Sequence, residues 1–183
     1  MSEQFQRMTF EQKVSYLVEN LKKLPADVVD EGIEVLAKAG ETEYAVVLAR
    51  ENGLTDRAIS ILIQSGDYLW AALIAKNAGR PEQSEQIYRD GLKYYIDMEM
   101  FGRAISAASA LALPADEIDC LYSRGIEVES RGIDLDHTRE MLDCAMQSLD
   151  ISLIGREDEL SKLLLKAVQE EREKGDSGYN LRR

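Results

Sequence analysis

The stretch GETEYAVVLARENGLTDRAISILIQSGDYLWAALIAKNAG, residues 40–79, decides the fold. Its glycines, Gly40, Gly53, Gly66 and Gly79, recur at every thirteenth position. Glycine readily takes the positive φ that the residue following a helix often needs. The spacing therefore predicts a series of short helices, each ended by a glycine and followed directly by the next helix.

Small and apolar residues recur at fixed offsets from these glycines. The fifth residue after each glycine is Ala45, Ala58, Ala71 or Ser84, and the eighth is Leu48, Ile61, Ile74 or Ile87. Offsets that differ by three or four residues lie on one face of a helix. Helices this short are marginal alone in water but become stable when neighbours bury their apolar stripes, which indicates a helical solenoid.

A second period, twice as long, is superimposed on the first. The fourth residue after each glycine is Tyr44, Arg57, Trp70 or Gln83, so aromatic and polar residues alternate and each kind returns at every twenty-sixth position. Alternation of this kind is typical of inner and outer layers of helices, and it predicts helical hairpins that each span two glycine-delimited units. Thr42 and Thr55 are expected to cap helix starts, and Pro81 suits a first turn.

Further helices are predicted on both sides of this stretch, and no strand is expected. We expect helices over 9–23, with Thr9 as N-cap, and over 26–39, 81–97, 116–131, 134–151 and 155–174, with another after residue 99. The predicted fold is all-α: a right-handed stack of short antiparallel helical hairpins. We expect a single domain over 1–175, regular over 27–111 and less regular over 114–174, with a flexible tail at 176–183.

The segment YAVVLARENGLTDRAISILIQSGDYLWAALIAKNAG resembles the helical-hairpin repeats of tetratricopeptide proteins. It is also similar to the repeats of clathrin heavy chain, coatomer and vacuolar-sorting subunits. The resemblance covers residues 27–111 and concerns architecture. The period is shorter than the tetratricopeptide repeat, and the Trp-Leu-Gly opening pattern is missing. The resemblance implies protein–protein scaffolding and supplies no site residues.

Composition limits the classes of partner. The net charge is −12, with 34 acidic and 22 basic residues, which repels nucleic acid and anionic membranes and favours a basic protein or peptide. No segment is apolar enough to span a membrane, and residues 1–20 do not resemble a signal peptide. Two cysteines make no disulfide framework, so we expect a cytoplasmic protein.

The sequence contains few groups suited to catalysis or metal binding. We expect no metal site and no cofactor, because the chain has one histidine and no Cys-x-x-Cys pair. Cys120 and Cys144 are expected to be small buried hydrophobes. His137 is expected to be solvated or to cap a helix.

Three functions are compatible with this sequence. The leading hypothesis is a non-enzymatic interaction module that binds a basic segment in a concave acidic groove, although the aromatic residues could instead pack between helices. The second is an enzyme or ligand-binding protein with a pocket between the regular and less regular halves. The third is a homo-oligomeric scaffold. The candidate partner-binding residues are Tyr44, Arg57, Trp70, Gln83, Tyr94 and Tyr95. The candidate pocket residues are Tyr94, Tyr95, Asp119, Cys120, His137 and Glu140.

Overall fold

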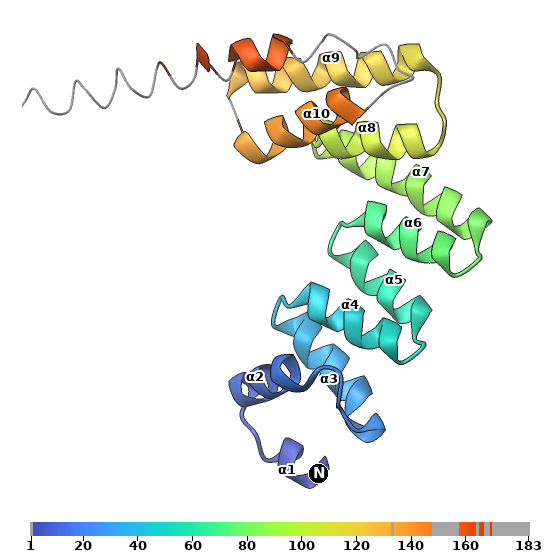
Figure 1. The fold of residues 1–183 in the computed structure, drawn as a ribbon, viewed down its shortest axis with the longest axis vertical. Coiled ribbons are helices and arrows are strands. Elements are labelled where there is room, and N and C mark those ends of the chain that lie inside the picture. Colours follow the sequence, from blue (N-terminus) through green and yellow to red (C-terminus); the bar gives the residue numbers. More distant parts are fainter. Residues whose placement is uncertain (1, 133, 148–157, 164, 167–168, 170–183) are drawn as a thin grey trace, which may run out of the picture. The chain divides into compact units, whose positions relative to one another are not determined.

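The protein is all-helical, as the sequence predicts (Figure 1). The structure is a computed structural model that describes residues 2–132, 134–147, 158–163, 165–166 and 169. No strand occurs among these residues. The chain divides into two compact units, Met1–Ile87 and Tyr88–Arg183.

The helices follow one another with short connections. The first unit contains α1 (Ser2–Gln6), α2 (Phe10–Asn20), α3 (Ala26–Lys38), α4 (Thr42–Glu51), α5 (Thr55–Gln64) and α6 (Tyr68–Asn77). Helix α7 (Pro81–Asp97) crosses the boundary, and the second unit continues with α8 (Phe101–Ala110), α9 (Ala115–Arg131), α10 (Leu135–Gln147) and a helical segment at 158–163. The ends of the helices predicted over 134–151 and 155–174, and the predicted tail at 176–183, lie outside the described residues.

One turn geometry joins the helices from α3 to α7. Gly40, Gly53, Gly66 and Gly79 have φ values of 80°, 73°, 82° and 75°. In all four turns the N–H of the residue after the glycine donates to a carbonyl five residues earlier, at 2.8–3.1 Å. This is the Schellman motif, in which a residue in the left-handed conformation follows the helix. Two carbonyls at the helix end, which have no partner within the helix, then accept hydrogen bonds from the backbone N–H groups of the turn. The glycines therefore end the helices, as their spacing predicts.

The residue after each glycine also begins the next helix. The carbonyl of Glu41 accepts from Ala45 N–H at 3.0 Å, and that of Leu54 accepts from Ala58 N–H at 3.1 Å. Glu41 and Leu54 are thus the N-caps of α4 and α5, and neither side chain makes a capping hydrogen bond. The expectation that Thr42 and Thr55 cap these helices is wrong, because the shared residue places the cap one position earlier.

The same turn occurs twice without glycine. Glu99 has a φ of 56° and Ala112 a φ of 53°, and these two residues are again thirteen positions apart. The N–H of Met100 donates to Tyr95 O at 2.8 Å, and that of Leu113 donates to Ala108 O at 3.0 Å. Helix α8 is therefore a further repeat unit, which the glycine pattern does not reveal.

Small residues at the fifth position let neighbouring helices pack closely. Ala45, Ala58 and Ala71 are all fully buried. Ser84 takes the same position in α7 and is 3% exposed, and its Oγ donates to Ala72 O on α6 at 2.8 Å. The hydroxyl is thus satisfied, so serine replaces alanine without leaving a buried polar atom unpaired.

Ion pairs connect alternate helices of the first unit. Arg57 on α5 reaches back to α3, with Nη1 at 2.6 Å from Asp30 Oδ1 and Nη2 at 3.3 Å from Glu34 Oε1. Arg80, directly before α7, pairs in the same way with Asp56 on α5. The helices α3, α5 and the start of α7 therefore form one layer, as the longer of the two sequence periods predicts.

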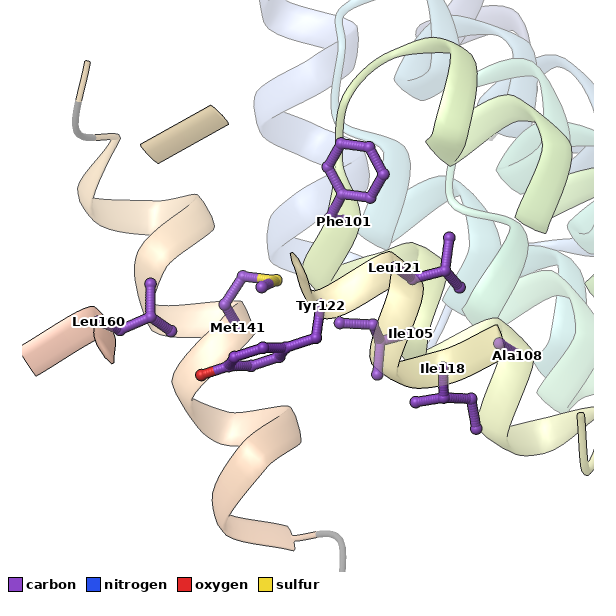
Figure 2. Close-up of a cluster of buried hydrophobic side chains, with 8 residues drawn as sticks. All are labelled: Phe101, Ile105, Ala108, Ile118, Leu121, Tyr122, Met141 and Leu160. Carbon is purple, nitrogen blue, oxygen red and sulfur yellow. The ribbon is translucent and has the colours of Figure 1, made fainter. Parts of the chain in front are cut away.

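The second unit has its own apolar core (Figure 2). Figure 2 shows Tyr122 of α9 lying beside Met141 of α10, with Leu160 of the 158–163 segment on the far side of Met141. The buried members of this core are Phe101, Ile105, Ala108, Ile118, Leu121, Tyr122, Met141 and Leu160. Helix α10 packs mainly against α8, and glycine at 102 makes this close approach possible.

We expect Gly53→Ala to lower the free energy of unfolding by about 1 kcal/mol, because alanine tolerates a positive φ poorly. An added Cβ at Gly53 would meet no atom within 4 Å, so the cost is confined to the backbone. Urea denaturation measures the change. The reverse substitution, Ala112→Gly, should raise the stability by about 0.5 kcal/mol, because it relieves the same strain. A stabilising Gly53→Ala would contradict the role given to the glycine turns.

Candidate functional site

Two of the candidate partner-binding residues occupy equivalent places on alternate helices. Tyr44 is on α4 and Trp70 is on α6, each four residues after its glycine. The side chain of Tyr44 is 40% exposed, and Trp70 is partly exposed. Both rings therefore reach the surface of the first unit.

Arg57 and Gln83 lie on the other set of helices, α5 and α7. Arg57 is held by the ion pairs to α3 described above, and Gln83 Oε1 accepts from Arg80 Nη1 at 3.4 Å. The structure therefore gives Arg57 a role in connecting helices and does not bring it into contact with Tyr44 or Trp70.

Tyr94 and Tyr95 are near the end of α7, within the second unit. Their ring centroids are 5.7 Å apart with an interplanar angle of 68°. Tyr95 is fully buried, whereas Tyr94 is partly exposed. Tyr94 is thus the one of this pair that can reach a partner.

Apolar side chains reach the surface on both α4 and α6, and we call these two patches together the α4/α6 face. It consists of Tyr44, Val47, Leu69, Trp70 and Leu73, of which Leu73 is 47% exposed. Tyr44 with Val47, and Trp70 with Leu73, are at positions 4 and 7 counted from the preceding glycine. Residues three apart share one side of a helix, so each pair forms a single patch. The sequence pattern predicts a role for the aromatic residues but not for Leu73, although Leu73 is three residues after Trp70 and therefore on the same side of α6.

The equivalent side of α8 is covered. Counted from Glu99, positions 3, 4 and 7 of this unit are Gly102, Arg103 and Ser106. Arg103 Nε is 3.0 Å from Glu140 Oε1, and Ser106 Oγ is 3.4 Å from Cys144 Sγ, so α10 lies along this side of α8. The residue pairs follow the same order along both helices, since Arg103 precedes Ser106 on α8 and Glu140 precedes Cys144 on α10. The two helices therefore run parallel. Positions 4 and 7, which reach the surface in α4 and α6, are thus covered by α10 in α8.

His137 belongs to a buried polar network at the start of α8. Its Nε2 accepts from the Phe101 N–H at 2.9 Å, so the proton of the neutral ring is on Nδ1, which faces Glu129 Oε1. The other carboxylate oxygen of Glu129 accepts from Thr138 Oγ1 at 2.5 Å and from Asp134 N–H at 3.2 Å. His137 therefore caps α8, one of the two roles expected for it, and Glu129 holds the ring in place.

The cysteines differ in their surroundings. Cys120 is exposed on α9, so the expectation that it is buried is wrong. It lies on the outer side of an amphipathic helix. Because cysteine is small and only weakly polar, the sequence does not indicate whether its side chain faces the core or the solvent. Cys144 is partly buried, its Sγ donates to Gly102 O at 3.2 Å, and burial raises the pKa of its thiol. A raised pKa disfavours the thiolate, which is the reactive form.

Three of the pocket candidates have different surroundings. Glu140 pairs with Arg103, Cys120 faces solvent, and both nitrogens of His137 are engaged. A hollow of about 510 Å³ occurs elsewhere, in the first unit, and none of the candidate residues lines it. Its lining residues are Gln4, Arg7, Met8, Glu11, Gln12, Ser15, Tyr16 and Glu19.

Neither a metal cluster nor a membrane helix is found in the part of the chain that the structure describes. No group of three or more His, Cys, Asp or Glu side chains there could hold a metal ion. No helix among those residues is both long and apolar enough to cross a bilayer.

No protein family, no curated protein and no solved structure matches the chain. The functional assignment therefore depends on the geometry of the repeat units.

We expect Glu129→Gln to lower the free energy of unfolding by about 1–3 kcal/mol, because an amide cannot accept from all the donors that surround the carboxylate. Thermal and urea denaturation measure the change. Glu127→Gln is the matched control, since Glu127 is exposed on the same helix, and it should shift stability by less than about 0.5 kcal/mol. Equal effects from the two variants would contradict the structural role of Glu129.

Alkylation of Cys144 reports whether α10 is docked. In the native chain we expect iodoacetamide to modify Cys144 at least about tenfold more slowly than Cys120, because the Cys144 thiol is buried and its pKa is raised. In Gly102→Ala the added Cβ would lie 2.5 Å from Glu140 Cβ and 2.9 Å from the Glu140 carbonyl carbon. The two rates should then converge as α10 is displaced.

The control for this experiment is Gly132→Ala. An added Cβ at Gly132 would meet no atom within 4 Å, and the φ of 175° is open to any residue. Mass spectrometry of the alkylated peptides measures both rates. Rapid alkylation of Cys144 in the native chain, or unchanged protection in Gly102→Ala, would contradict this packing of α10.

Proposed function

We propose that the protein is a non-enzymatic protein–protein interaction module that binds a partner on the α4/α6 face. One observation carries this proposal: α8 holds another helix on positions 3, 4 and 7, whereas apolar side chains reach the surface at positions 4 and 7 of α4 and α6. Apolar side chains that reach the surface at regular helical spacing are typical of surfaces that bind a partner.

The net charge of −12 supports a positively charged partner segment. A field of this sign accelerates the encounter with cations and opposes the approach of polyanions. In this proposal the apolar side chains supply the contact and the charge supplies the long-range attraction. Binding should therefore weaken as the salt concentration rises.

The architecture supports a scaffold role of the kind seen in tetratricopeptide-like and clathrin-like helical repeats. Hairpins of two repeat units, joined by one recurring turn, place equivalent side chains at regular intervals along a stack. Two unpaired cysteines support a reducing, cytoplasmic location.

An enzyme or small-molecule pocket is the weaker candidate. A Cys–His nucleophile needs a free imidazole nitrogen beside the thiol. His137 uses Nε2 to cap α8 and directs Nδ1 to Glu129. The arrangement around His137 therefore supports a structural role for the residue and favours the interaction module.

Site-specific photo-crosslinking tests the proposal. A benzophenone amino acid placed at position 73 should give adducts with a distinct partner in the cells that make the protein, since Leu73 is the most exposed side chain of the face. Mass spectrometry identifies the adducts. Tyr44→Glu should reduce their yield at least about fivefold, because a carboxylate is costly in an apolar contact.

The matched control places the same amino acid at position 60, where Ser60 is exposed on α5 in the other layer. This position should give few adducts with the same partner. Equal yields from positions 60 and 73, or a yield that does not respond to Tyr44→Glu, would contradict binding on the α4/α6 face.

A further inference from the structure

We infer that a second copy of this chain docks on the α4/α6 face, with the two copies related by a two-fold axis and their α4 helices antiparallel. This inference rests on the proposed function, because it takes the same face as the contact surface. It adds a second copy of the chain to the basic segment as an occupant of this face, and the charge pattern of α4 is the basis for that choice.

Unpaired charges of opposite sign lie at the two ends of the face. Glu43 is at the start of α4, and Arg50 is near its end, seven residues later. Both are exposed, and neither makes an ion pair with any residue that the structure describes. Residues seven apart lie on the same side of a helix, with Val47 between them. This side of α4 is thus acidic at one end, apolar in the middle and basic at the other end.

Helix α6 shares only the basic end of this pattern. Asp67 is its N-cap, and Lys76 is the exposed cation in its last turn. Trp70 and Leu73 lie between them, as Tyr44 and Val47 do on α4. Arg50 and Lys76 are equivalent, each ten residues after its glycine. The α6 residue equivalent to Glu43 is Leu69, so the full acidic, apolar and basic pattern belongs to α4.

A helix side with this charge pattern is complementary to a second copy of itself that runs in the opposite direction. In an isologous dimer each contact occurs twice, with the same patch on both copies. If the second α4 runs antiparallel, Glu43 meets Arg50 of the second copy, and Arg50 meets Glu43 of the second copy. The apolar residues of the two copies then meet in the middle. A parallel pairing would place like charges together.

The net charge gives this dimer an unusual dependence on salt. Two chains of net charge −12 repel each other at long range, and salt screens that repulsion beyond about 8 Å at physiological ionic strength. Dimerisation should therefore strengthen as salt rises from low to moderate concentration. Binding of a basic partner shows the opposite trend, so the two occupants of the face are distinguishable.

Sedimentation equilibrium with charge-reversed variants tests the inference. Glu43→Arg and Arg50→Glu should each weaken dimerisation at least about tenfold, because each turns two attractive pairs into repulsive ones. An equimolar mixture of these two variants should dimerise again, because both pairs are restored in the mixed dimer. Restoration on mixing requires that positions 43 and 50 of different copies face each other.

Lys38→Glu is the control, since it changes the net charge as Arg50→Glu does but lies at the exposed end of α3. It should leave the dissociation constant within about twofold of the native value. A chain that stays monomeric at high micromolar concentration in moderate salt overturns the inference, and so does a dimer that charge reversal does not affect. Either result leaves the proposed function standing if the adducts from position 73 contain a different protein.

Discussion

The repeat stack depends on one residue per turn that serves two helices. At Glu41, Leu54 and Asp67 the N–H completes the end of one helix, and the carbonyl begins the ladder of the next. A positive-φ residue directly before each of them makes this possible. No connecting loop exists at these points, so the direction of each helix follows from the one before. The buried alanines, the ion pairs between alternate helices and the α4/α6 face all follow from that fixed relation.

Much of this fold could be predicted from the sequence, because glycine marks the turns from α3 to α7 and small residues mark the contacts. The prediction failed where the physical signal was absent. Glu99 and Ala112 take the same left-handed conformation without glycine, so the sequence included α8 among the regular repeats but did not reveal the two turns that bound it. Thr42 was predicted as an N-cap because threonine favours that position, but the N-cap of α4 is Glu41, the residue shared with the preceding turn.

The site was less predictable than the fold, because a sequence offset gives the side of a helix and not what covers that side. Position 4 is Tyr44 in α4, Trp70 in α6 and Arg103 in α8. The first two reach the surface, and the third pairs with α10. Arg57 illustrates the same limit: its position suggested partner binding, while its carboxylate partners lie 23 and 27 residues away within the chain. The covering of α8 by α10 became visible only once Gly102, Glu140 and Cys144 could be placed together.

The turns without a spacer have a consequence for how this chain can change. An α-helix advances by about 100° per residue, so one residue inserted at the start of α5 would rotate the residues that follow it in this helix by that angle. The buried row that begins with Ala58 would then point to solvent, and no loop could absorb the error. Loops usually tolerate insertions and deletions, but these turns contain no spare residue, so we expect a change of length between residues 36 and 84 to be destabilising. Only whole repeat units, or whole hairpins, can be added or lost there without disturbing the layers.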